Sequence, residues 1–117
     1  MYQDIKERTF NFALRVIDFS IMLPRTQAGK VLGGQVLRSG TSVGANVEEG
    51  VAAYSKDEYI YKMNIALKEA REAHYWLRLI GRSNMLGCKS VNDLIVEADE
   101  IKKILGAIVS KLRGKSK

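Results

Sequence analysis

Apolar side chains recur at alternating steps of three and four residues through most of this chain. This spacing keeps them on one side of an α-helix, and no stretch shows the apolar–polar alternation that is typical of a strand. The first series is Ile5, Thr9, Phe12, Val16, Phe19 and Leu23. Two later series are Met63, Ala66, Ala70, Ala73, Leu77 and Ile80, and Leu94, Ala98, Ile101, Leu105, Ile108 and Leu112. The sequence therefore predicts an all-α protein.

Few residues interrupt this pattern. Pro24 is the only proline, and Ser55 with Glu58 three residues later forms a capping-box pattern that begins a helix. Ser90 with Asp93 is a weaker version of that pattern. We predict helices near residues 4–23, 26–53, 56–83 and 91–113, and a basic tail at residues 111–117. Rods of about 30 to 42 Å joined by short turns would pack as an antiparallel up-down four-helix bundle, in one domain of residues 1–117.

The second predicted helix is rich in glycine. Its residues Gly33, Gly34, Gly40 and Gly44 should together cost about 4 kcal/mol relative to alanine in a helix interior. Three of them share one stripe, where the missing side chains would let another backbone approach closely. We interpret Gly33, Gly40 and Gly44 as part of an oligomer interface. The alternative is a broken helix with a loop near residues 33–34, and a phosphate-binding loop is less favoured because the lysine of a Walker motif is absent.

The third predicted helix carries more apolar surface than one bundle seam can bury. Ile65, Trp76 and Leu79 lie on a stripe beside the seam. An extra stripe that includes tryptophan is typical of a subunit interface. We therefore predict that these three residues contribute to self-association, and the alternative is a long apolar flank of a single bundle.

Two polar side chains of the second predicted helix, Ser39 and Asn46, fall on its core-facing stripe. Buried polar groups are costly unless they are paired, so we expect a satisfied network, in which Glu69 and Glu72 of the third helix could meet Arg38 across an interface. A role in register and assembly is favoured over a ligand-binding or catalytic role. The residues of this expected network are Arg38, Ser39, Ser42, Asn46, Glu49, Gly50, Glu69 and Glu72.

The positive charge is concentrated at one end of the chain. Nineteen Lys and Arg residues against thirteen Asp and Glu residues give a net charge of +6, and residues 101–117 contain no acid. The candidate phosphate-binding residues there are Lys102, Lys103, Lys111, Arg113, Lys115 and Lys117. Such a patch would bind nucleic acid electrostatically, without base readout. The alternative is a solubilising helix end whose cations complement the helix dipole.

Several chemistries are disfavoured. His74 is the only histidine and Cys88 the only cysteine, so one chain can form neither an internal disulfide nor a zinc cage of several such ligands. The Glu-x-x-His pairs of di-iron bundles are absent, and nucleophilic catalysis would depend on His74 as base. We expect a protein that is not an enzyme and has no cofactor or metal. No segment resembles a signal peptide or a membrane span, which favours a cytoplasmic location.

The block from Leu37 to Gly50, LRSGTSVGANVEEG, resembles the signature of bacterial four-helix bundle proteins encoded in intervening sequences of 23S ribosomal RNA genes. The stretches 66–72 and 75–79 resemble the third-helix block of one branch of that family. The matching signature positions are Arg38, Ser42, Asn46, Glu49 and Gly50. The chain departs from many relatives at Gly44, where they have proline, and at Glu48, where they have a small residue.

This resemblance implies a cytoplasmic bundle that assembles as a homopentamer, with suspected nucleic-acid binding. A related protein is the accessory variability protein of diversity-generating retroelements, a basic pentamer that partners a reverse transcriptase. Two functions are therefore expected. The first is a nucleic-acid-binding accessory protein that contacts the phosphates of RNA or DNA. The second is a protein–protein scaffold, for example for a reverse-transcriptase-like partner, with no direct nucleic-acid role.

Overall fold

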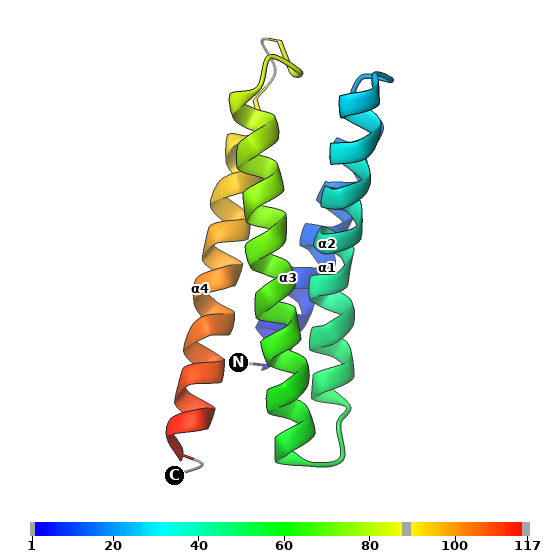
Figure 1. The fold of residues 1–117 in the computed structure, drawn as a ribbon. Helices are drawn as coiled ribbons and strands as arrows, with labels where there is room; N and C mark the ends of the chain where they lie inside the picture. Colours follow the sequence, from blue (N-terminus) through cyan, green and yellow to red (C-terminus); the bar gives the residue numbers. More distant parts are fainter. Residues whose placement is uncertain (1, 88–89, 116–117) are drawn as a thin grey trace.

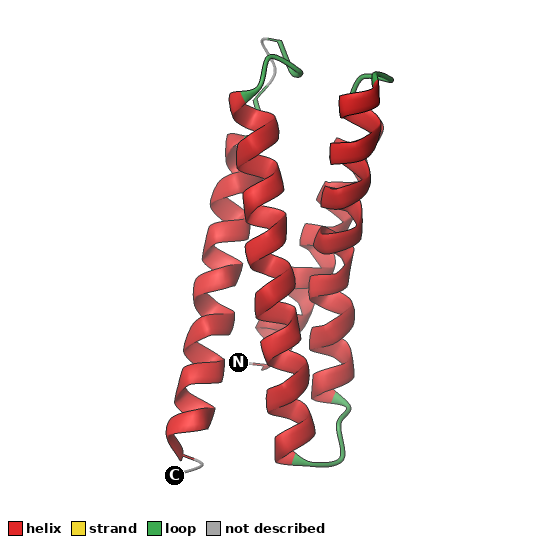
Figure 2. Cartoon of the chain, in the orientation of Figure 1, coloured by secondary structure: helices red, strands yellow, loops and turns green. Residues whose placement is uncertain are grey.

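The computed structural model describes residues 2–87 and 90–115, which form four helices. They are α1 (Tyr2–Ile21), α2 (Gln27–Val51), α3 (Lys56–Arg82) and α4 (Asn92–Lys115). The helices run alternately up and down, and each packs beside the next in sequence while α1 also contacts α4 (Figure 1). The described residues contain no strand, and their loops only connect the helices (Figure 2). The prediction of an all-α up-down four-helix bundle is confirmed.

The helix starts follow from capping residues, and the predicted bounds differ from the observed ones by at most two residues. The Thr26 hydroxyl accepts a hydrogen bond from Gly29 N at 3.0 Å, and the Ser55 hydroxyl accepts one from Glu58 N at 3.1 Å. Each bond satisfies an amide that the first helical turn leaves unpaired. The predicted Ser90–Asp93 box is wrong in detail, because the Ser90 hydroxyl accepts instead from Asn92 N, at 3.2 Å.

The predicted apolar series form the core of the bundle. Fifteen of the eighteen residues in the three series are buried hydrophobics, Thr9 is also buried, and only Phe19 and Leu112 are half-buried. α2 adds Val36, Val43 and Val47, all fully buried. The core therefore runs along the long axis of the molecule, whose extent is 48 Å. None of the helices in the described ranges has a stretch long and apolar enough to cross a membrane.

Gly40 and Gly44 of α2 face α1 of the same chain, and Gly33 faces Leu23 in the connection between α1 and α2. A methyl group at Gly40 would lie 2.9 Å from both methyl carbons of Val16, and one at Gly44 would lie 3.2 Å from the carbonyl oxygen of Thr9. One at Gly33 would lie 3.1 Å from Leu23 Cδ1. The assignment of these glycines to an oligomer interface is therefore corrected, because α1 and Leu23 of the same chain already occupy the space that they leave. α2 also continues through residues 33–34, without the alternative break.

Candidate nucleic-acid interface

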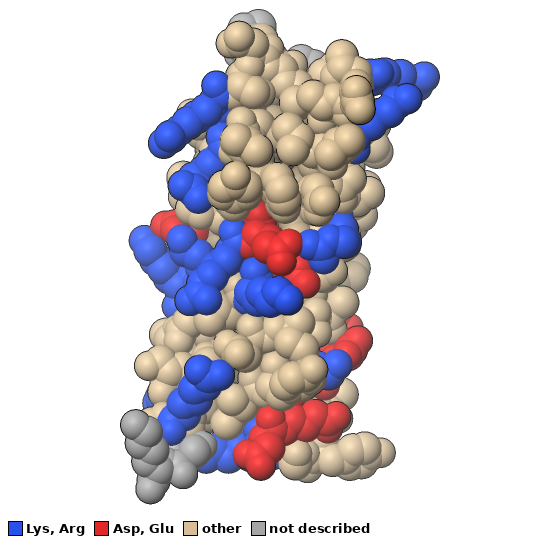
Figure 3. All heavy atoms as spheres, viewed as in Figure 1, with Lys and Arg blue, Asp and Glu red and all other residues tan. Residues whose placement is uncertain are grey.

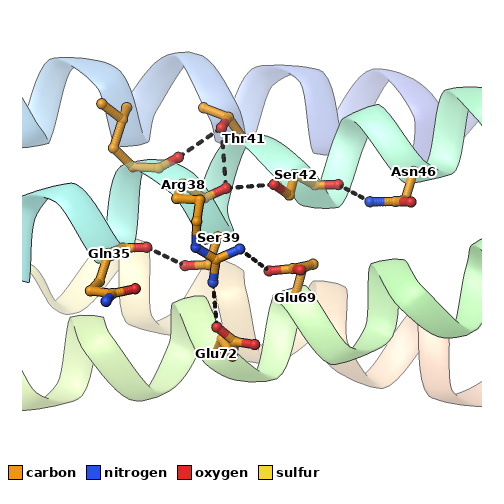
Figure 4. Close-up of polar contacts among 9 residues, drawn as sticks. Gln35, Arg38, Ser39, Thr41, Ser42, Asn46, Glu69 and Glu72 are labelled. Carbon is orange, nitrogen blue, oxygen red and sulfur yellow. Dashed lines mark hydrogen bonds and ion pairs between the residues drawn. The ribbon is translucent and has the colours of Figure 1, made fainter.

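Arg38 links α2 to two carboxylates of α3 (Figure 4). Its Nη1 donates to Glu69 Oε1 at 3.2 Å, and its Nη2 donates to Glu72 Oε1. The Glu69 side chain is only 11% exposed, so this ion pair compensates for the burial of a charge. The three residues meet as expected, and the interface that they join lies between α2 and α3 of one chain.

The remaining members of the polar network are satisfied locally. The Ser39 hydroxyl donates to the carbonyl of Gln35 at 2.8 Å, and the Ser42 hydroxyl donates to that of Arg38 at 2.7 Å. Asn46 Nδ2 donates to the carbonyl of Ser42 at 2.9 Å (Figure 4). These bonds run back to the preceding helical turn, so the side chains bury their polar atoms against α2 itself.

The last two network positions join α2 to the start of α3. Lys62 Nζ donates to Glu49 Oε1 at 2.6 Å, and this bond raises the pKa of Lys62 above its ordinary value. A methyl group at Gly50 would lie 3.2 Å from Lys62 Cβ and 3.3 Å from Met63 Sδ. Gly50 therefore lets α3 pack closely against α2.

The residues of α3 that were predicted to form an oligomer interface differ in their exposure to solvent. Ile65 and Trp76 are half-buried, and Trp76 packs against the core. The Trp76 Nε1 donor is buried and has no hydrogen-bond partner among the described residues. Leu79 is 41% exposed. Only Leu79 of the three therefore presents a largely accessible apolar surface.

A longer exposed apolar stripe, not predicted from the sequence, lies on α1. It consists of Phe10, Leu14, Ile17 and Ile21, which are between 38% and 75% exposed. Their spacing of four, three and four residues keeps them on one face of the helix, turned away from the core series. The four-three-four spacing could have identified this stripe in the sequence. The core series of α1 has the same spacing over the same residues, so the second series was not distinguished from it.

The predicted phosphate-binding residues of α4 fall into two groups. Lys102 Nζ and Lys103 Nζ both contact Asp99, at 3.1 and 2.9 Å, and their hydrogen bonds lower the pKa of Asp99 to about 2. Lys111 and Arg113 are exposed and form no ion pair with a described residue. Among the predicted phosphate-binding residues, the cations without an ion pair to a described residue therefore lie in the last turns of α4. Lys115 ends that helix, and Lys117 lies outside the described residues.

Two hollows between α3 and α4 join these cations to residues of α3. Both hollows are lined by Leu67, Arg71 and Gly106. The first, of about 470 Å³, is further lined by His74, Arg78, Lys102 and Lys103. The second, of about 510 Å³, is further lined by Asn64, Val109, Ser110, Arg113 and Gly114. Lys and Arg side chains gather along this side of the molecule (Figure 3).

Arg71 and Arg78 were not among the residues predicted from sequence. They lie in the part of the chain where acids and bases balance, so a count of charges conceals them. They are seven residues apart, which places them on the same face of α3. That spacing is the one sequence feature that could have identified them.

His74 lies among these cations as a half-buried residue. Burial, followed by the positive charges of Lys102 and Arg78, lowers the pKa of His74 below its ordinary value of 6.5. The nearest carboxylate oxygen, Asp99 Oδ1, is 3.9 Å from Nε2, which is too far for a hydrogen bond to offset these effects. His74 is therefore neutral at neutral pH and adds no charge to the hollow.

The described residues contain no group of three or more His, Cys, Asp and Glu arranged to hold a metal ion. Cys88 lies outside the described residues. The features that remain are a satisfied polar network between α2 and α3, an exposed apolar stripe on α1, and a cationic surface along α3 and α4. Of these, the cationic surface is the one suited to a polyanionic ligand.

Comparisons with known proteins identify the family. The model of the family described as 23S rRNA-intervening sequence protein matches residues 2–107. A similar solved structure is a 1.70 Å crystal structure from Bacteroides thetaiotaomicron VPI-5482, described as a protein with unknown function from the S23 ribosomal protein family. It is 37% identical, with a TM-score of 0.84, and the match covers 93% of this chain and 97% of that one. No protein with a curated description matches. The chain belongs to the 23S rRNA-intervening sequence protein family, as the resemblance of its sequence predicted.

Proposed function

We propose that this protein is a non-enzymatic, cytoplasmic homo-oligomer that binds RNA or DNA through phosphate contacts. The observation that carries the proposal is the pair of exposed cations, Lys111 and Arg113, in a segment that holds the entire excess of positive charge. Free cations near a helix end can neutralise phosphates and release counterions, which gives binding without base specificity.

The proposal is tested by removing this pair of charges. The variant Lys111→Gln/Arg113→Gln is compared with Arg25→Gln/Lys30→Gln, which removes one arginine and one lysine from exposed positions far from the end of α4. Shortening α4 instead would remove the buried Ile108 and would test folding rather than binding. Binding to labelled structured RNA and to duplex DNA is measured by fluorescence anisotropy across a salt series.

On duplex DNA, the slope of log affinity against log salt should become shallower by about 1.8 in the first variant, since each lost phosphate contact contributes about 0.9. The control variant should keep the slope of the natural chain. Equal losses in the two variants would show that net charge matters and position does not. No binding by the natural chain at low salt would overturn the proposal and favour the protein–protein scaffold, with a reverse-transcriptase-like enzyme as the kind of partner to test.

The self-association in this proposal is supported by the apolar stripe on α1, because exposed apolar side chains in a continuous stripe are typical of protein interfaces. Five as the number of subunits comes from the resemblance to pentameric bundle proteins. Light scattering should give a mass about five times the 13.1 kDa of one chain. Leu14→Glu should reduce that mass, and Val96→Glu, at a 56% exposed position on α4, should not. A monomer mass for the natural chain would refute self-association.

A further inference from the structure

The two hollows between α3 and α4 form one groove. They share three lining residues, and from Asn64 to Arg78 the groove extends roughly 20 Å along α3 at ~1.5 Å per residue. Arg71 lies at its centre, lines both hollows and forms no ion pair with a described residue. Its guanidinium is therefore available to a ligand.

Gly106 deepens the groove from the side of α4. Apart from the adjacent backbone of α4 itself, no heavy atom of a described residue comes within 4 Å of the position that a methyl group at Gly106 would occupy. Glycine is unfavourable inside a helix, and here neither a positive φ nor a close neighbour requires it. The missing side chain at Gly106 leaves open space between α3 and α4.

An exposed aromatic ring stands beside the cations. Tyr75 is 49% exposed, and the guanidinium of Arg78 lies 5.9 Å from the centre of its ring. The same ring packs edge-on against Trp76, with the ring centres 5.0 Å apart. Trp76 in turn packs against the core, so the tyrosine ring contacts a residue that is held in place. A cationic groove flanked by an exposed aromatic ring is the arrangement that single-stranded nucleic acids favour.

We propose that the α3–α4 groove binds the sugar–phosphate backbone of a single nucleic-acid strand, with Arg71 as the central phosphate contact and Tyr75 as a stacking surface for a base. This inference rests on the proposed function and adds the location of the site and the strandedness of the ligand. Asp99 opposes binding, because it holds Lys102 and Lys103 and a phosphate must compete with it for them.

The test uses the full-length protein and a labelled oligothymidylate, with a DNA duplex as the comparison. Arg71→Gln removes the central charge, and Gly106→Leu fills the groove without changing any charge. Lys30→Gln is the matched control for charge, since Lys30 is exposed on α2 away from the groove. Circular dichroism and urea unfolding establish that each variant is folded, and Arg71→Gln remains informative if Gly106→Leu does not fold.

The natural chain should bind the single strand more tightly than the duplex. Arg71→Gln and Gly106→Leu should each weaken single-strand binding at least about fivefold, and Arg71→Gln should make the salt slope shallower by about 0.7. Tyr75→Ala should weaken it by about fivefold or more, since stacking on an aromatic ring contributes about that much per base. Asp99→Asn should tighten binding, and Lys30→Gln should change it less than twofold.

Three results would overturn the inference. If the natural chain binds nucleic acid but the groove variants behave like Lys30→Gln, the groove is not the site, although the proposed function stands. If duplex binds as tightly as single strand and Tyr75→Ala has no effect, the ligand is not a single strand. If the natural chain binds neither nucleic acid at low salt, the proposed function fails, and this inference fails with it.

Discussion

Replacing Gly40 with alanine should destabilise this bundle, whereas the same replacement at Gly34 should stabilise it. Both glycines lie inside α2, so alanine improves the helix propensity by about 1 kcal/mol at either position. They differ in their surroundings. At Gly34 the new methyl group would have no described heavy atom within 4 Å apart from the adjacent backbone of α2, but at Gly40 it would lie 2.9 Å from both methyl carbons of Val16.

The magnitude follows from these contacts. Val16 is fully buried, and its branched side chain is confined to few rotamers, so it cannot turn away from a new methyl group. Overpacking of this kind costs about 1–3 kcal/mol. Gly34→Ala should therefore raise the free energy of unfolding by about 1 kcal/mol, and Gly40→Ala should change it by about 0 to −2 kcal/mol. The difference between the variants, about 1–3 kcal/mol, isolates the packing contribution because the propensity effect is common to both.

Urea unfolding of the natural chain and the two variants, at two protein concentrations, measures this difference. The dependence of the unfolding free energy on urea should be the same for all three, so that the midpoints report stability. A Gly40→Ala variant as stable as Gly34→Ala would refute the reasoning. A difference that grew with protein concentration would place the contact between subunits and not between α2 and α1 of one chain.

Two further predictions concern groups where α4 meets α1 and α3. Arg8 Nε and Nη2 both donate to the Glu97 carboxylate at 2.8 Å, and these bonds join α1 to α4. Glu97→Gln should therefore lower the free energy of unfolding by about 1 kcal/mol. An unchanged urea midpoint at pH 7 would contradict this prediction. Burial and the charges of Lys102 and Arg78 lower the pKa of His74 in the folded protein. The His74 imidazole therefore takes up a proton more readily in the unfolded chain, so the free energy of unfolding should fall as the pH drops below 6.5. His74→Gln should weaken that dependence, and an NMR titration giving a pKa at or above 6.5 would contradict it.

The sequence predicted the helices and their buried faces well, because both depend on residues close together in the chain. Ser55 and Glu58 form a helix start through bonds within one turn, and the series from Ile5 to Leu23 faces the core through the period of the helix alone. The signature around Asn46 also identified the family. None of these inferences required knowing which helices would be neighbours.

Pairing between helices was predicted only in part. The charges of Arg38, Glu69 and Glu72 indicated that they would meet, but opposite charges attract equally within a chain and between chains. The glycines of α2 likewise indicated a close approach by another backbone without identifying it as that of α1.

The spacing of apolar residues and the capping residues by themselves determined four amphipathic helices, since each of these effects acts within one or two turns. Only the tertiary structure decided that α1 covers the glycines at 40 and 44, and that Arg71 and Arg78 share a groove with Lys102 and Lys103. The physical reason is that these neighbours are remote in sequence, so their proximity depends on how whole helices pack.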